Sequence, residues 1–526
     1  MEFDYIVVGA GSAGCALAAR LSEDPNTQVC LLEAGGRDSS PLIHMPFGAV
    51  VMLPGKYQNW GFQTVPQAGL NGRRGYQPRG KTLGGSSSIN AMAYVRGHQD
   101  DYNDWQHLGW GWETVLPYFR KSEHNERGED AYHGVGGPLN VADLRTPNPV
   151  SHAYIEAAQS LGYRHNTDFN GAEQEGVGLY QVTQKNGRRC STAQAFLRPA
   201  EQRPNLTILT QARALKLLLD GTTCTGVEIL QRKTRKTLNA RREVIVSAGA
   251  LQSPQLLMLS GIGPADELYK HGIPLLHELP GVGQNLQDHP DYITAYTSRF
   301  KGLMGFSPVG IFNNARGLMQ YLRNGTGCLT TNFAEGGAFL KTDPSLARPD
   351  IQFHFVISIV DDHARKIHMQ HGFSCHVCVL RPKSKGSVTL ASADPLADPL
   401  IDPAFLQHDD DMTALMKGVQ VMKNVMESQP LAPYRDREIF GESSLTTSEL
   451  EQLVRNRTDT VYHPIGTCRM GEDELAVVSP DCRVRGLSGL RVVDASVLPN
   501  LIGGNTNAPT IMVAERVADL IRHQAG

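Results

Sequence analysis

The stretch DYIVVGAGSAG, residues 4–14, decides the expected fold. A short apolar strand runs directly into a Gly-x-Gly-x-x-Gly turn, and a helix of small residues follows. A second apolar run, residues 28–32, then ends in Glu33. In a dinucleotide-binding unit the three glycines allow a tight turn, close approach of a pyrophosphate and close packing of helix on strand, while the acid accepts hydrogen bonds from a ribose. The pattern therefore predicts a Rossmann-like nucleotide site.

The composition sets limits on the class of protein. A chain of 526 residues is longer than one hydrophobic core usually supports, so we expect two associated domains. The formal net charge of −3 offers no basic surface for nucleic acid. No uninterrupted apolar run is long enough to span a membrane, and no room for a signal peptide precedes Asp4. With nine scattered cysteines, we expect a cytoplasmic protein with reduced thiols.

A Cys-x-x-Cys pair at Cys375 and Cys378 has the spacing of a metal or redox site. However, residues 373–380 alternate like a buried strand, in which these two thiols point to opposite faces. There is no second such pair. We therefore predict no metal site.

The coarse pattern indicates a nucleotide fold interrupted by a second domain. Helices are expected at 114–122, 150–161, 254–260, 409–428 and 510–523, and strands at 206–219, 227–230, 244–248, 351–357, 373–380, 387–390 and 490–493. The predicted class is α/β, with residues 1–155, 200–298 and 456–526 forming the nucleotide domain. Residues 156–199 and 299–455 then form a substrate domain built on an antiparallel sheet flanked by helices.

A glycine-serine stretch, GKTLGGSSSIN at residues 80–90, is suited to line a phosphate or a flat ring. Further motifs are GALQSPQLLMLSGIG (249–263), GVGQNLQDH (281–289), HPIGTCRM (463–470), VDAS (493–496) and GNTNAPT (504–510). Together with the opening turn, these motifs resemble the glucose–methanol–choline (GMC) oxidoreductases, flavoproteins that oxidise alcohols. Within that family, residues 41–46 and 181–187 and the final motif most resemble bacterial membrane-associated aliphatic alcohol dehydrogenases of alkane degradation. Choline dehydrogenases come next.

The resemblance implies FAD as the cofactor, and the presence of two phosphate-type loops agrees with it. Some family members carry a histidine in the glycine-serine loop that bonds covalently to the flavin. The matching position here is Ile89, so we expect non-covalent FAD. The implied cofactor-binding residues are Gly9, Gly11, Ser12, Ala13, Gly14, Glu33, Ala34, Thr82, Gly85, Ser86, Asn90, Ala91, Met92, Ala93, Ala212, Ala214, Ala248, Gly249, Asp494, Ala495, Asn505 and Thr506.

Alcohol oxidation by a flavin needs a base for the hydroxyl proton, a donor to the substrate oxygen and a free flavin N5 for hydride. His463 and Asn507 lie in family motifs and match the first two roles, because a neutral imidazole accepts a proton and an amide donates without titrating. His289 also lies in a motif, and a structural role is expected for it. Substrate contacts are predicted for Glu335, His354 and Tyr462, with Glu335 as an anchor for a quaternary ammonium and Tyr462 as a cation–π face.

The leading prediction is an FAD-dependent dehydrogenase of primary aliphatic or arylalkyl alcohols that passes electrons to a quinone or artificial dye. An oxidase that uses O₂ on aromatic or furan alcohols, a choline dehydrogenase and a non-redox lyase are the alternatives. The apolar loop 46–54 is either a lid over the flavin or a peripheral contact with the inner membrane. The sequence does not indicate an oligomeric state.

Overall fold

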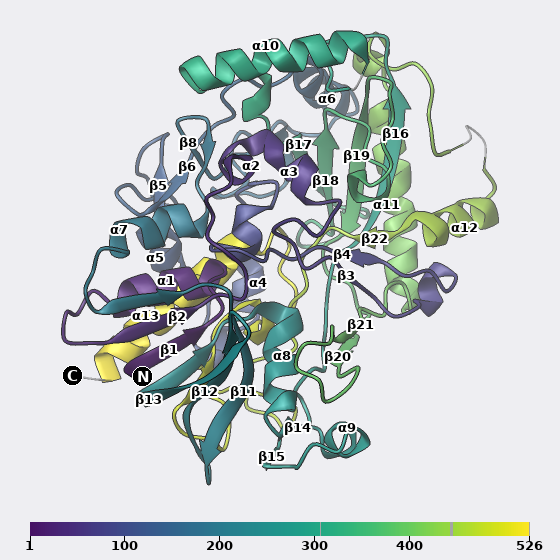
Figure 1. Cartoon of the computed structure of the whole chain (residues 1–526). Coiled ribbons are helices and arrows are strands. Elements are labelled where there is room, and N and C mark those ends of the chain that lie inside the picture. Colours follow the sequence, from purple (N-terminus) through teal and green to yellow (C-terminus); the bar gives the residue numbers. More distant parts are fainter. Residues whose placement is uncertain (306, 442–444, 525–526) are drawn as a thin grey trace.

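The computed structural model describes residues 1–305, 307–441 and 445–524. Two sheets organise the chain, one at the end that holds both termini and the other in the opposite half (Figure 1). Each sheet has its own apolar core. The mixed α/β class and the two-sheet plan predicted from the sequence are confirmed.

The first sheet brings together strands from distant parts of the chain. The parallel strands lie in the order β10 (Leu206–Leu209), β2 (Val29–Leu32), β1 (Glu2–Val8) and the end of β13 (Thr234–Val246), and β23 (Leu490–Val492) pairs with β13. The beginning of β13 instead pairs antiparallel with β12 (Thr223–Gln231), which pairs with β11 (Ala212–Asp220). This parallel core is the sheet that the opening motif predicts, because β1 and β2 are apolar along their buried length.

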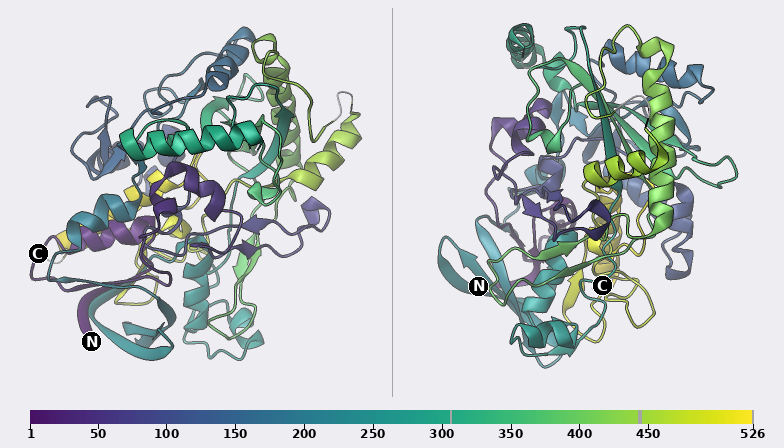
Figure 2. Two further views of the ribbon diagram at one scale, coloured as in Figure 1. Left: turned by 45° about the horizontal axis from the view of Figure 1, so that its top comes forward. Right: turned by 90° about the vertical axis from the view of Figure 1, so that its right-hand side faces the viewer.

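The first and last helices cover one face of this sheet side by side. Helix α1 (Ser12–Leu21) packs against α13 (Asn507–Gln524), as Figures 1 and 2 show. Arg20 on α1 forms two 2.8 Å hydrogen bonds to the carboxylate of Glu515 on α13, whose side chain is fully buried. A bidentate pair of this kind fixes the relative position of the two helices.

The second sheet is antiparallel and six-stranded. Its order is β22 (Asp459–Thr460), β16 (Pro290–Thr297), β19 (Gly372–Val379), β18 (Ile351–Val356), β17 (Ala334–Leu340) and β7 (Gly176–Leu179). Helices α6 (Pro149–Ser160) and α11 (Asp409–Glu427) pack on it. Helix α11 begins with three aspartates, which suit the positive N-terminal end, and buries apolar residues at helical spacing.

The domain boundaries differ slightly from the prediction. Strands β16 and β22 belong to the second sheet, although 200–298 and 456–526 were assigned to the nucleotide domain. Helix α6 also packs on the second sheet. The pattern of a short strand does not reveal which of two sheets it joins, and this choice is made by tertiary packing.

Most predicted helices and strands are present, with ends shifted by a few residues. Cys375 and Cys378 lie on β19, as predicted, and pack into different apolar clusters. One long helix has no counterpart in the prediction: α10 (Pro308–Asn324), which lies across the outside of the molecule (Figure 1). Among the described residues, no helix combines the length and the apolar character needed to cross a bilayer.

Candidate active site

The glycine turn after β1 lines one end of a long cavity. Gly9 has a φ of +103°, and a Cβ there would lie 2.5 Å from the carbonyl oxygen of Ser247. A Cβ on Gly14 would lie 1.9 Å from the Gly9 carbonyl oxygen, so α1 packs directly on the turn. Around Gly11, in contrast, nothing lies within 4 Å of such an atom. The N-terminus of α1 therefore faces open space, as a phosphate site requires.

Glu33 lies at the end of β2 and lines the same cavity. Its carboxylate accepts hydrogen bonds from the backbone N–H groups of Ala10 at 3.2 Å and Gly35 at 2.7 Å. Burial raises the pKa of Glu33 to about 7. These two bonds hold the acceptor beside the glycine turn, where the ribose of a dinucleotide is expected.

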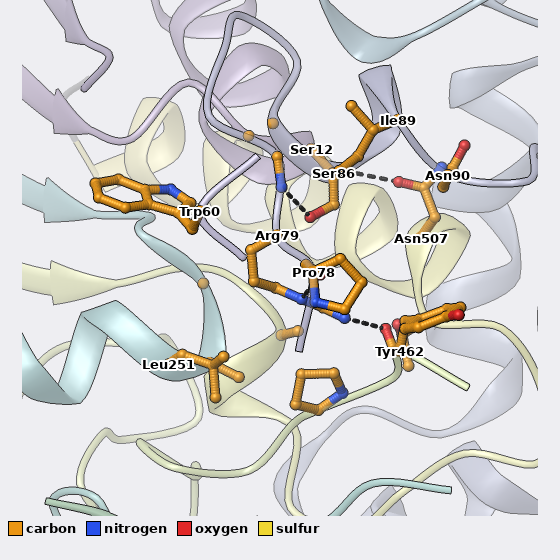
Figure 3. Close-up of a pocket in the computed structure, with 18 of the residues that line it drawn as sticks. Ser12, Trp60, Pro78, Arg79, Ser86, Ile89, Asn90, Leu251, Tyr462 and Asn507 are labelled. Atoms are coloured by element: carbon orange, nitrogen blue, oxygen red, sulfur yellow. Dashed lines mark hydrogen bonds between the residues drawn. The ribbon is translucent and has the colours of Figure 1, made fainter. Parts of the chain in front are cut away.

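The glycine-serine stretch lies against the glycine turn. A Cβ on Gly85 would be 2.7 Å from the Cα of Gly11, so the two phosphate-type loops touch. The hydroxyl of Ser86 accepts a hydrogen bond from the Gly80 N–H at 3.2 Å (Figure 3). Ile89 is buried in a small apolar cluster with Ile43 and Met52 and also lines the cavity. The aliphatic side chain at this position has no atom that could form a covalent bond to a flavin.

The residues predicted to bind the cofactor converge on this cavity. Of the predicted set, two residues do not line it: Gly14, which packs on the turn, and Thr82, whose hydroxyl donates to the Gly36 carbonyl. At the opposite wall, Asp494 accepts hydrogen bonds from the Gly249 N–H at 2.8 Å and the Ser253 hydroxyl at 2.5 Å. A Cβ on Gly249 would meet nothing within 4 Å, so this wall also leaves room for a ligand. The donor set and the open glycines fit FAD.

His463 stands at the far end of the cavity, and its two ring nitrogens have different partners. Nδ1 lies 2.9 Å from Nδ1 of His289, and Nε2 lies 3.1 Å from the amide nitrogen of Asn505. Burial, together with the neighbouring His289, His354 and Arg79, lowers the pKa of His463 well below its usual value. The imidazole of His463 is therefore neutral at physiological pH.

His289 determines which nitrogen of His463 carries the proton. Nε2 of His289 lies 3.0 and 3.1 Å from the carbonyl oxygens of Leu380 and Ile502, and carbonyls only accept, so this nitrogen must donate. Burial lowers the pKa of His289 to about 3, so its ring is neutral and its Nδ1 is an acceptor. Nδ1 of His463 then donates to it, and Nε2 of His463 keeps a lone pair at the cavity.

The asparagines beside His463 are arranged differently from the prediction. Asn505, predicted for the cofactor, donates to Nε2 of His463. Asn507, predicted for the substrate oxygen, lines the cavity and accepts a 2.7 Å hydrogen bond from the hydroxyl of Ser12 on α1 (Figure 3). Both are close in sequence, and the turn before α13 decides which one faces the imidazole.

Two further histidines line the same end of the cavity. Nε2 of His354 lies 3.2 Å from the amide of Gln352, while its Nδ1 has no hydrogen-bond partner among the described residues. Burial lowers the pKa of His354 to about 3. His376 is bonded to Asp291 at 2.6 Å and was not singled out in the sequence. The sequence around a single histidine in a strand does not show whether its side chain lines a cavity or packs in the core.

Tyr462 and Arg79 close this end of the cavity. The hydroxyl of Tyr462 is 2.7 Å from Nδ1 of His363, whose Nε2 is 3.0 Å from Asp459. The Tyr462 carbonyl accepts a 2.9 Å hydrogen bond from the Arg79 guanidinium (Figure 3). Burial lowers the pKa of Arg79 to about 10, which still leaves a cation beside His463. Arg79, directly before the glycine-serine stretch, was missed in the sequence.

Glu335 does not reach the cavity, and this corrects the prediction of a substrate contact. Its carboxylate accepts hydrogen bonds from the Asn148 N–H and the hydroxyls of Ser151 and Thr331, at 2.7 to 2.8 Å. The pairing of β17 with β18 is interrupted by a bulge between Ala334 and Gly336, and the preceding Ala334 lines the cavity instead. Among the described lining residues, the carboxylates are those of Glu33 and Asp494, at the nucleotide part of the cavity.

The apolar loop 46–54 forms two short helices, η1 (Pro46–Gly48) and α3 (Ala49–Met52). Ala49, Val50 and Leu53 line the cavity, whereas Val51 points outward and is half exposed. The segment therefore covers the cavity, as expected for a lid.

The sequence matches two family models, both described as GMC oxidoreductase, over residues 3–291 and 382–514. The chain is a GMC oxidoreductase. This GMC oxidoreductase is 48% identical to the alcohol dehydrogenase [acceptor] of Pseudomonas putida, over 99% of the chain and 95% of the relative. It is 42% identical to the oxygen-dependent choline dehydrogenase of Brucella ovis, over 99% and 96%. Its structure resembles pyridoxine 4-oxidase from Mesorbium loti, with a TM-score of 0.90, 33% identity and 99% coverage of both chains.

GMC oxidoreductases are FAD-dependent flavoproteins, and FAD is the cofactor of this chain. The contact between the two glycine loops, the open space at Gly11 and the position of Glu33 all agree with a bound dinucleotide.

Proposed function

We propose that this GMC oxidoreductase oxidises neutral primary alcohols, aliphatic or arylalkyl, to aldehydes, and passes the electrons to a quinone or other non-oxygen acceptor. The observation that carries the proposal is the lone pair on Nε2 of His463, which faces the cavity because Nδ1 donates to His289. When bound, FAD would accept the hydride of the carbinol carbon at N5. The chain supplies the base, the positioning and the exclusion of water.

His463 takes the hydroxyl proton in this scheme. Its pKa is low, so the imidazole is neutral before the reaction, and the substrate hydroxyl replaces Asn505 as the partner of Nε2. The Asn505 amide and the Arg79 guanidinium, both near His463, then stabilise the negative charge that develops on the oxygen. General base catalysis of this kind typically increases the rate by about 10²- to 10⁴-fold.

The cavity wall supports a neutral substrate over choline. Ala334, Phe333, Val356 and Val461 give this end an apolar lining, and the nearest acid on the strand, Glu335, faces away. A quaternary ammonium would be desolvated there without a carboxylate to pair with it, which is costly. The similarity to a relative named alcohol dehydrogenase [acceptor] supports the same choice.

An oxidase that uses O₂ is the second candidate, and it is favoured by the structural likeness to pyridoxine 4-oxidase. One experiment separates the candidates. The holoenzyme is mixed with a series of alcohols without oxygen, and bleaching of the flavin is followed; its reoxidation is then timed with a quinone and with O₂. We expect bleaching by primary alcohols, slow bleaching by choline, and faster reoxidation by the quinone. Flavin that stays oxidised with every alcohol would contradict the proposal and favour a non-redox member.

A further inference from the structure

Helix α10 carries several large apolar side chains that are exposed to solvent. Its inner face touches the body through two glycines: a Cβ on Gly310 would lie 2.2 Å from the Gly305 carbonyl oxygen, and one on Gly317 2.3 Å from Sγ of Cys328. The outer side carries large apolar side chains with exposed fractions of up to 74%, namely Ile311, Phe312, Leu318, Met319 and Leu322. We call these five side chains the α10 face. Because these side chains remain exposed to water, they do not stabilise the fold of the isolated chain.

Basic residues flank the α10 face in the sequence. Residues 299–333 include Arg299, Lys301, Arg316 and Arg323 and no aspartate or glutamate, although the whole chain carries a formal net charge of −3. On a helical wheel, Arg316 and Arg323 fall beside the apolar stripe rather than opposite to it. The face is therefore an amphipathic surface bordered by cations.

Neighbouring segments extend this surface. Ser307, the N-cap of α10, is hydrogen-bonded to His371, which is close in sequence to Lys366 and to the exposed Ile367 and Met369. At the other end of α10, the Tyr321 hydroxyl reaches the carbonyl of His44, in the segment that leads to the half-exposed Val51. In both views of Figure 2, α10 lies above the helices of residues 41–52.

The same segments also wall the active-site cavity. Val50 and Leu53 line it from one side, and Val360 and Ala364 from the other. Segments that carry exposed apolar side chains thus also contribute to the wall of the cavity.

We propose that the α10 face docks on the surface of a bilayer that contains anionic phospholipids, with α10 lying in the plane of the interface. An amphipathic helix with basic flanks binds such surfaces by burying apolar side chains and by attracting lipid headgroups. A second copy of the chain fits less well, because a two-fold contact centred on this face would bring Arg316 and Arg323 of the two copies together. The proposal concerns attachment and holds whatever alcohol the enzyme oxidises.

The test is flotation of the FAD-loaded protein with vesicles, without substrate. We expect binding to vesicles of equal parts phosphatidylglycerol and phosphatidylcholine, weak binding to phosphatidylcholine alone, and loss of binding at high salt. The fraction bound to vesicles should fall by at least about tenfold in the variant Ile311→Ser/Phe312→Ser/Met319→Ser/Leu322→Ser. The variant Arg316→Glu/Arg323→Glu should lose binding to a similar extent, about tenfold or more, on the anionic vesicles.

The control removes other exposed apolar side chains elsewhere on the surface. Tyr269, Leu276 and Leu475 are at least half exposed, and none belongs to the α10 face. Tyr269→Ser/Leu276→Ser/Leu475→Ser should float like the unchanged protein. Flavin absorbance of each variant confirms that it is folded and loaded.

A fluorescence measurement provides a second readout. The four native tryptophans, Trp60, Trp105, Trp110 and Trp112, are all buried. In the variant Phe312→Trp, the added indole should be quenched by brominated lipid, and the native signal should not. Equal flotation of the serine variant and the unchanged protein, or an unquenched indole at position 312, overturns the proposal. A dimer that becomes monomeric in the serine variant, with no flotation of either protein, would assign the face to a second copy instead.

Discussion

The Nδ1 atoms of His463 and His289 lie 2.9 Å apart, with the two ring planes at 90° to each other. Because the other nitrogen of His289 faces two carbonyl oxygens, this contact leaves a lone pair on Nε2 of His463. The tautomer of His463, the candidate base, is therefore set by another histidine and not by a carboxylate.

Replacing His463 should abolish the chemistry and spare the cofactor. We expect His463→Ala to retain FAD and to reduce it with alcohol about 10²- to 10⁴-fold more slowly, as for loss of a general base. Anaerobic stopped-flow absorbance of the flavin measures this rate. His165→Ala, at an exposed histidine, is the control and should be unaffected. A His463 variant with a near-normal rate would place the base elsewhere.

The pH dependence should reflect the lowered pKa of His463. A base whose pKa lies below 6.5 stays neutral as the pH falls through 6.5, so the flavin-reduction rate should show no acid limb there. In His289→Ala, water can reach the imidazole and the pKa of His463 should rise toward 6.5. The limb should then become visible between about pH 6 and 7. An acid limb near 6.5 in the unchanged enzyme would contradict the assignment.

The two asparagines should differ in effect. Asn505 donates to Nε2 of His463, whereas Asn507 bonds to Ser12 at the N-terminus of α1. We expect Asn505→Ala to slow flavin reduction by about tenfold or more through loss of a donor at the reacting oxygen. Asn507→Ala should chiefly weaken FAD retention, measured by dilution and release of free flavin. The reverse pattern would restore Asn507 to the substrate oxygen.

A carboxylate placed in the cavity should change the preferred substrate. Ala334→Glu directs an acid to the wall that Ala334 now lines. We expect kcat/KM for an apolar primary alcohol to fall by about tenfold or more, because the charge is desolvated without a partner, and the ratio of choline to alcohol turnover to rise. Ala334→Gln has the same size without the charge and should leave that ratio unchanged. Steady-state assays with a dye acceptor give both values.

The bound flavin should be released by acid. Ile89 offers no atom for a covalent link, so acid precipitation should leave a colourless protein pellet and free FAD in the supernatant, identified by chromatography. A yellow pellet would show a link at another residue.

Much of the nucleotide half could be predicted because its signals are local. The strand, turn, helix and acid from β1 to Glu33 follow one another without a gap, and each has a fixed physical role. Which residues of β17 face the cavity could not be predicted in this way. A bulge between Ala334 and Gly336 shifts its register, so only the folded sheet shows that Ala334, not Glu335, faces the cavity.

The partners of His463 could not be predicted either. His289 is 174 residues away in sequence, and its contact depends on how the two sheets meet. Helix α10 was missed because it contributes little to the core: along its length only Gly310 and Gly317 are buried, so its apolar residues do not mark an inner face.

The pairing of Arg20 with Glu515 has a consequence for biosynthesis. The nucleotide sheet contains β1 from the first residues of the chain and β23 from near its end, and α1 packs on α13. During translation the first strand and glycine turn leave the ribosome long before the helix that packs on them. Until α13 has emerged, the nascent chain therefore lacks both the helix that packs on α1 and the Asn505 to Asn507 part of the cavity wall.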